Sequence, residues 1–140
     1  MTLEENIFTD PKNDNVNLKP IDKHSHVKGS SSPPLVHYTI SNLLKKTVSK
    51  FGQRDAFIFP DHKLNYKEFD YMVDKLAIGF IKIGLKKGDR LGIWSPNRLE
   101  WVLTQFATAR IGVILVNINP AYRLSELEYS LNKVGCKALI

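Results

Sequence analysis

The stretch from Gly88 to Tyr122 has the pattern of one complete strand, helix and strand, and it limits the possible folds more than any other part of the chain. Arg90–Trp94 is a short apolar run that follows a glycine turn, which is typical of a buried parallel strand. Ser95 and Pro96 end this run, and Val113–Val116 forms a second, β-branched one. Two strands joined through a helix over about thirty residues predict a right-handed parallel crossover. The sequence therefore indicates an α/β fold.

The helix inside this unit has recognisable ends and one apolar face. Asn97 is a candidate N-cap, and Glu100, three residues later, completes a pattern that resembles a capping box. Gly112 is placed to end the helix. The predicted inward face consists of Leu99, Val102, Phe106 and Ala109.

Two helices and a hairpin are predicted before this unit. Thr39 caps a helix that runs through Lys50, with an apolar side made of Ile40, Leu43, Leu44, Val48 and Phe51. The short runs Ala56–Phe59 and His62–Leu64 flank a Pro-Asp turn, and they predict a hairpin outside the parallel sheet.

The second helix has the clearest pattern in the chain. Asn65 and Glu68 form a capping box, and Gly84 ends the helix. Its apolar stripe predicts a core face rather than a cofactor site, and it comprises Phe69, Met72, Val73, Leu76, Ala77 and Phe80.

The last part of the chain predicts one more helix and strand. Ser125 and Glu128 have capping-box spacing, and Gly135 ends the helix, whose inward residues are Leu127, Leu131 and Val134. Lys137–Ile140 has the pattern of another buried strand. We therefore expect the beginning of a mostly parallel βαβ sheet with flanking helices that stops inside a strand. The expected whole is a longer α/β protein.

Residues 1–38 are predicted to be a disordered or extended leader, and residues 39–140 the folded portion. The leader contains four prolines and no hydrophobic periodicity. Gly29–Ser32 is interpreted as a linker and not as a phosphate loop, because Pro33 and Pro34 follow where a helix should begin. The start of the chain lacks the pattern of a presequence, and no run reaches the ~20 apolar residues of a membrane span.

The net charge of +6 has two interpretations. Residues 1–38 contain four lysines and five acidic residues, so the basic surplus lies in residues 39–140. It could attract an anionic partner such as a nucleotide, coenzyme A, nucleic acid or a membrane surface, but solvated helix faces and turns are the favoured explanation.

Cys136 is the only cysteine, which excludes a disulfide framework. His24 and His26 lack further ligands at useful spacing, so no metal site is assigned.

No catalytic constellation is complete in the sequence. It has no phosphate loop with Lys and Ser or Thr, no dinucleotide fingerprint and no nucleophile elbow. Ligands of open α/β sheets bind beyond the carboxyl ends of the strands, here Ser95–Asn97 and Asn117–Pro120. Their polar groups could contact a ligand, although turns and helix caps are the favoured role.

Four ordered blocks resemble one family. They are LNYKEF (64–69), GLKKGDRLGIWSPNRLEW (84–101), ATARIGVILVNINPAY (107–122) and ELEYSLNKVGCKALI (126–140). Together they resemble the N-terminal part of the adenylate-forming (AMP-dependent synthetase/ligase) enzymes, in particular the acyl-CoA synthetases of the medium-chain fatty-acid type. The resemblance covers residues 39–140.

The resemblance implies an ATP-dependent fatty-acid–CoA ligase. Such enzymes use Mg-ATP to convert a carboxylate to an acyl-adenylate and then transfer the acyl group to coenzyme A. The substrates implied are a fatty acid, ATP and coenzyme A, with no nucleic acid and no transmembrane segment. The family's phosphate loop, nucleotide contacts and catalytic lysine lie beyond the matched blocks. We therefore assign no catalytic, cofactor-binding or metal-binding residue here and expect the 140 residues alone to be inactive.

The matched residues count as scaffold in this interpretation. Tyr66 and Glu68 lie at a helix start, Gly88 and Asp89 in a turn, and Asn119, Pro120 and Tyr122 in a loop. The similar enzymes imply a mitochondrial location, but without a presequence a cytoplasmic or peroxisomal one stays open.

Two alternatives remain. The first is a short, non-catalytic α/β binding or interaction protein derived from the same subdomain. The second is a small nucleotide-binding or receiver-like domain, which is less favoured because the phosphate loop and clustered acidic residues of such domains are absent.

Overall fold

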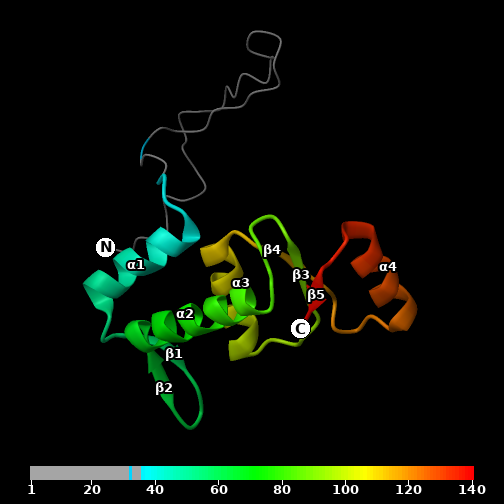
Figure 1. Ribbon diagram of the computed structural model, residues 1–140. Coiled ribbons are helices and arrows are strands. Elements are labelled where there is room, and N and C mark those ends of the chain that lie inside the picture. Colours follow the sequence, from blue (N-terminus) through cyan, green and yellow to red (C-terminus); the bar gives the residue numbers. More distant parts are fainter. Residues whose placement is uncertain (1–31, 33–35) are drawn as a thin grey trace, which may run out of the picture. The chain divides into compact units, whose positions relative to one another are not determined.

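Three parallel strands form the sheet that organises the part of the chain described by the computed structural model, namely Ser32 and residues 36–140 (Figure 1). Strand β3 (Arg90–Ile93) lies between β4 (Ile114–Asn117) and β5 (Ala138–Leu139) and is parallel to both. Each strand lies within a residue or two of its predicted position. The α/β class and the parallel sheet are therefore confirmed, whereas almost all of the predicted leader lies outside the described residues.

The predicted hairpin forms a separate sheet. Strands β1 (Asp55–Ile58) and β2 (Lys63–Asn65) pair antiparallel and do not join the parallel sheet. The hairpin connects helix α1 (Ile40–Phe51) to helix α2 (Tyr66–Lys82). Phe57 of β1 packs on Phe69 of α2 with ring centroids 4.9 Å apart, which attaches the hairpin to the helical layer.

The start of α1 is as predicted, but its apolar side is not. The hydroxyl of Thr39 accepts a hydrogen bond from the amide of Asn42 at 3.1 Å, as an N-cap should. Leu44 is buried, whereas Ile40 and Leu43 are about half exposed. The helix contacts α2 and α3 along one narrow side, so only part of the predicted stripe is covered.

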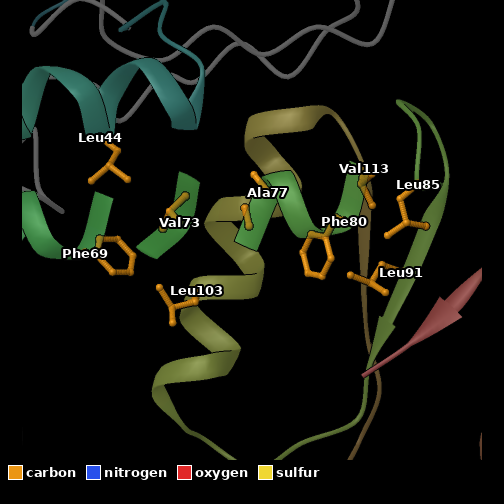
Figure 2. Packing of buried hydrophobic residues seen from close by; sticks show 10 residues of the cluster. Leu44, Phe69, Val73, Ala77, Phe80, Leu85, Leu91, Leu103 and Val113 are labelled. Carbon is orange, nitrogen blue, oxygen red and sulfur yellow. The ribbon is translucent and has the colours of Figure 1, made fainter. Parts of the chain in front are cut away.

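Helix α2 provides the centre of the core, as its stripe predicted. Asn65 accepts from the amide of Glu68 at 2.9 Å, and the Glu68 carboxylate accepts from the amide of Asn65 at 3.0 Å, which completes the capping box. At the other end, the amide of Leu85 donates to the carbonyl of Phe80 while Gly84 has φ +90°, the geometry of a Schellman end. Figure 2 shows the buried cluster, which contains Leu44, Phe69, Val73, Ala77, Phe80, Leu85, Leu91, Leu103, Ala107 and Val113.

Helix α3 (Leu99–Ile111) departs from prediction at its start and in its buried face. Arg98, not Asn97, occupies the N-cap position, and no side chain caps the helix. Leu99, Val102, Phe106 and Ala109 are only partly buried, and the fully buried residues are Leu103, Thr104, Ala107 and Thr108. The two threonine hydroxyls donate to helix carbonyls, Thr104 to Glu100 at 2.7 Å and Thr108 to Thr104 at 2.8 Å. Because both hydroxyls are hydrogen-bonded, these two polar residues can be buried on the side of α3 that packs on α2 and β4.

Helix α4 (Leu124–Val134) lies on the opposite side of the sheet from α2 and α3 (Figure 1). It begins at Leu124, directly after Arg123. Ser125 therefore lies inside the helix and is not its N-cap, contrary to the prediction. The carboxylate of Glu126, rather than that of Glu128, accepts from the amide of Arg123 at 3.2 Å. Leu127 is buried, but Val134, predicted to point inward, is 40% exposed because the helix covers only part of the sheet.

Candidate functional site

The carboxyl ends of the three parallel strands lie at one edge of the sheet, where the sequence places Ser95–Asn97 and Asn117–Pro120. The indole nitrogen of Trp94 donates to the carbonyl of Asn119 at 3.1 Å, and the amide of Trp94 donates to the carbonyl of Ile140 at 2.8 Å. The amide of Ile118 donates to the carbonyl of Ile93 at 2.9 Å. Trp94 therefore joins the loops that follow β3 and β4 to the end of β5.

The polar side chains at this edge are used mostly by their own loops. Asn119 Oδ1 accepts from the amide of Ala121 at 3.0 Å, and the hydroxyl of Ser95 donates to the carbonyl of Pro96 at 3.0 Å. Asn97 is exposed and caps no helix. These bonds match the favoured interpretation of the edge as a set of turns. The edge presents no nucleophile paired with a base among the residues described.

The densest group of charges lies elsewhere, between α1, α2 and α3. The guanidinium of Arg110 donates to Asp70 Oδ1 at 2.6 Å and also bonds Asp74. Lys45 Nζ lies 2.7 Å from Asp70 Oδ2 and 3.1 Å from Asp74 Oδ2. The side chains of Arg110 and Asp70 are each 11% exposed. We call Lys45, Asp70, Asp74 and Arg110 the interhelix charge cluster.

Electrostatics favour the charged form of each partner at the rim of this cluster. The hydrogen bond that Lys45 donates to Asp70 raises the pKa of Lys45 above its usual 10.5, against the opposing effect of burial. Burial would raise the pKa of Asp74, but hydrogen bonds from Lys45 and Arg110 outweigh it and lower that pKa below 3.8. Both shifts favour the charged forms of Lys45 and Asp74, and the ion pairs of these two residues with Asp70 and Arg110 fit a structural tie between helices.

A second group of charges lies at the amino-terminal edge of the sheet. Lys137 Nζ donates to the carbonyl of Gly84 at 2.9 Å and to Asp89 Oδ2 at 2.8 Å. The hydrogen bond from Lys137 lowers the pKa of Asp89, with a further contribution from the amide of Lys86. Arg90 Nε donates to the carbonyl of Val134 at 2.8 Å. Both cations thus bind carbonyls at helix C-terminal ends, where positive charge is favoured.

Neither a metal site nor a reactive thiol is apparent in the described residues. No group of three or more His, Cys, Asp or Glu side chains that could hold a metal occurs there. Burial raises the pKa of the Cys136 thiol, which disfavours the nucleophilic thiolate. His24 and His26 lie outside the described residues. The assignment of no catalytic, cofactor-binding or metal-binding residue therefore stays a prediction.

Open hollows occur on the surface of α4. The larger, of about 600 Å³, is lined by Ser125, Glu128, Tyr129, Asn132 and Lys133. Within it Lys133 Nζ donates to the hydroxyl of Tyr129 at 2.9 Å. All five residues come from one helix, and no second element supplies a facing group. This arrangement is typical of a helix surface rather than a catalytic pocket.

No helix in the described part of the chain has the length and apolar character of a membrane span.

The parallel sheet, with helices on both of its faces and loops at its carboxyl edge, defines this part of the chain as an α/β domain. The chain belongs to the AMP-binding enzyme family, whose sequence pattern matches residues 44–140.

Relatives with assigned activities share much of the sequence. The mouse protein named medium-chain acyl-CoA ligase ACSF2, mitochondrial, is 46% identical over 126 residues, which is 89% of this chain and 20% of the relative. Its human counterpart is 46% identical over 123 residues, 86% of this chain and 20% of the relative. The chain thus spans about a fifth of the length of these relatives.

Solved structures share the fold. The N-terminal subdomain of Klebsiella oxytoca NpsA superposes with a TM-score of 0.68 at 24% identity, over 73% of this chain and 27% of that one. The N-terminal domain of FACL13 from Mycobacterium tuberculosis gives a TM-score of 0.70 at 23% identity, over 72% and 26%. These similarities show the fold.

No sequence pattern predicts the interhelix charge cluster. Asp70 and Asp74 are four residues apart on α2, a spacing that places them together, but Arg110 is 40 residues from Asp70 in the sequence. Only the packing of α3 on α2 brings them into contact.

Proposed function

We propose that residues 39–140 form the N-terminal portion of the AMP-binding domain of an ATP-dependent fatty-acid–CoA ligase. The observation that carries this proposal is the 46% identity, over 126 residues, with the mouse medium-chain acyl-CoA ligase. A carboxylate oxygen of the fatty acid bonds to the α-phosphorus of ATP, and pyrophosphate leaves. The sulfur of coenzyme A then bonds to the acyl carbon, AMP leaves, and the thiol proton passes to solvent.

The described residues contribute scaffold to this reaction. Leu91 and Ile93 anchor the central strand in the core, and the loops after β3 and β4 are held to each other through Trp94. Such an edge can support ligand-binding groups supplied by other parts of a larger domain. We assign the fatty acid, ATP and coenzyme A to the whole protein, and we assign Mg²⁺ to none of the residues described here.

A chimera tests whether this segment serves in a ligase. Residues 39–140 would replace the matching block of the mouse medium-chain acyl-CoA ligase, and release of AMP would be measured with a medium-chain fatty acid, Mg-ATP and coenzyme A. We expect a soluble chimera with fatty-acid-dependent activity within about tenfold of the parent, equivalent to about 1.4 kcal/mol in the barrier.

The controls are the unmodified parent and the parent with the block deleted, which should be insoluble or inactive. A chimera that unfolds with the cooperativity of the parent but releases no AMP would contradict the proposal. That result would instead favour the non-catalytic binding protein as the function to test.

A further inference from the structure

Helix α2 has an outer side that none of the other described elements covers. Tyr71, Lys75, Ile78 and Lys82 recur at intervals of four, three and four residues, which places them on one face of the helix, opposite the buried stripe. Ile81 flanks this row, and Ile83 follows the end of the helix. We call these six residues the α2 outer face.

The apolar members of this face are unusually open to solvent. The exposed fractions are 59% for Tyr71, 53% for Ile78, 56% for Ile81 and 69% for Ile83. Single exposed apolar residues are normal on protein surfaces, but here three isoleucines and a tyrosine are exposed within the thirteen residues 71–83.

The same face carries positive charge that is not neutralised within the described residues. Lys75 and Lys82 are exposed and form no ion pair there, and neither do Lys86 and Lys87 in the following turn. Lys75 Nζ lies 4.5 Å from the centroid of the Tyr71 ring. The nearby carboxylates of α2 are already engaged: Asp70 and Asp74 bind Arg110 and Lys45 in the interhelix charge cluster.

We propose that the α2 outer face docks on the surface of an anionic lipid bilayer. Aliphatic side chains can enter the boundary between headgroups and acyl chains, while lysine stems lie along the apolar surface and their ammonium groups reach lipid phosphates. A row of lysines disfavours a second copy of the same face, because like charges would meet. The inference is independent of the catalytic proposal, and its test uses no ligase activity.

Vesicle sedimentation with the full 140-residue chain tests this docking. The chain would be mixed with vesicles of phosphatidylcholine alone or of phosphatidylcholine with phosphatidylserine, at low and at physiological salt. We expect binding to the anionic vesicles that weakens as salt rises, and little binding to the neutral ones. The double variant Lys75→Glu/Lys82→Glu should lower the partition coefficient roughly tenfold or more.

A matched control separates this face from net charge. Lys46→Glu/Lys50→Glu changes the total charge equally, at exposed positions on α1, and should retain most of the binding. Ile78→Ser/Ile81→Ser should reduce binding while leaving every charge in place. Circular dichroism of each variant establishes that the helices are retained.

The proposal would be overturned by equal binding to neutral and anionic vesicles, by equal losses in the two lysine variants, or by unchanged binding in the isoleucine variant. A chain that sediments with no vesicle at low salt would also overturn it, and an acidic protein surface would then be the partner to test. None of these results would bear on the chimera experiment.

Discussion

At the scale of single residues, the strongest constraints lie where the interior holds charge or lacks space. Asp70 is largely buried and accepts from both Arg110 and Lys45. A buried charge that loses its partner keeps the cost of desolvation without the compensating attraction. Gly92, at the middle of the central strand, is constrained by space, because neighbouring side chains lie close to where a Cβ would be.

Replacing Arg110 should destabilise the protein strongly. Arg110→Met removes the bonds to Asp70 and Asp74 and leaves Asp70 with Lys45 alone, so we expect the free energy of unfolding to fall by about 3 kcal/mol or more. Urea denaturation at neutral pH measures the change. Lys63→Met is the control, because Lys63 pairs with Asp55 at a mostly exposed site and should change stability by only about 0–1 kcal/mol. Equal losses in both variants would refute a special role for the cluster.

Side chains at Gly92 should be poorly tolerated. A Cβ there would lie 3.0 Å from Leu139, 3.1 Å from Ile118 and 3.2 Å from Leu131. We expect Gly92→Val to reduce the free energy of unfolding by about 1–3 kcal/mol, and Gly92→Ala by less, because these side-chain ends can shift a little.

The control for this site is Gly79→Ala. Gly79 lies inside α2 with no atom within 4 Å of the added Cβ, so alanine should stabilise the helix by about 0.5–1 kcal/mol. Thermal denaturation of the three variants gives the order, and a Gly92→Val protein as stable as the wild type would show that the sheet face has space.

At the scale of elements, the start of a helix was predictable only where the predicted cap side chain accepts from an amide of the first turn. Asn65 and Glu68 exchange both bonds of a capping box. Asn97 and Ser125 have the same residue pattern, but their helices begin after Arg98 and Arg123. Capping spacing is necessary for the motif, whereas tertiary contacts set the residue at which each helix begins.

Alanine substitutions distinguish the true cap from the apparent one. Asn65→Ala should lower the free energy of unfolding by about 1 kcal/mol, since it leaves the amide of Glu68 without its acceptor. Ser125→Ala should change stability by less than about 0.5 kcal/mol, because Ser125 is an exposed residue within the first turn of α4. Chemical denaturation of both variants provides the comparison. A larger loss for Ser125→Ala would mean that α4 starts where the sequence pattern indicated.

At the scale of the whole molecule, the sheet is covered unequally on its two faces. Helices α2 and α3 bury one face in the main core, and α2 alone contributes four residues to the hydrophobic cluster, Phe69, Val73, Ala77 and Phe80. Helix α4 has one buried residue, Leu127, and Ile114 and Leu139 remain about half exposed. Regions with few buried apolar contacts open at lower free energy than the core.

Hydrogen exchange should reveal this inequality. We expect amides in α4 (Leu124–Val134) to exchange at a lower opening free energy than those in α2 (Tyr66–Lys82) and β3 (Arg90–Ile93). Exchange of the full chain followed by mass spectrometry resolves the segments. Uniform protection of all three elements would mean that α4 unfolds only with the core.

The local pattern of the sequence determined the elements, their order and the α/β class. Periods of two and 3.6 residues, glycines such as Gly112 with φ +72°, and the Asn65 capping box depend on neighbours a few positions away. The family followed from blocks spread over the chain. The assignment of no catalytic residue also came from the sequence, and it stays a prediction.

The tertiary structure alone decided which faces are buried and which charges meet. Burial of Thr104 and Thr108 in place of Ala109, and exposure of Ile40 and Val134, depend on how many neighbours cover each helix. Arg110 meets Asp70 because α3 packs on α2, and Trp94 meets Asn119 because β3 and β4 lie side by side. The physical reason is the distance along the chain over which each interaction acts. Propensity and capping act within a turn or two, whereas burial and ion pairing depend on contacts between residues far apart in the chain.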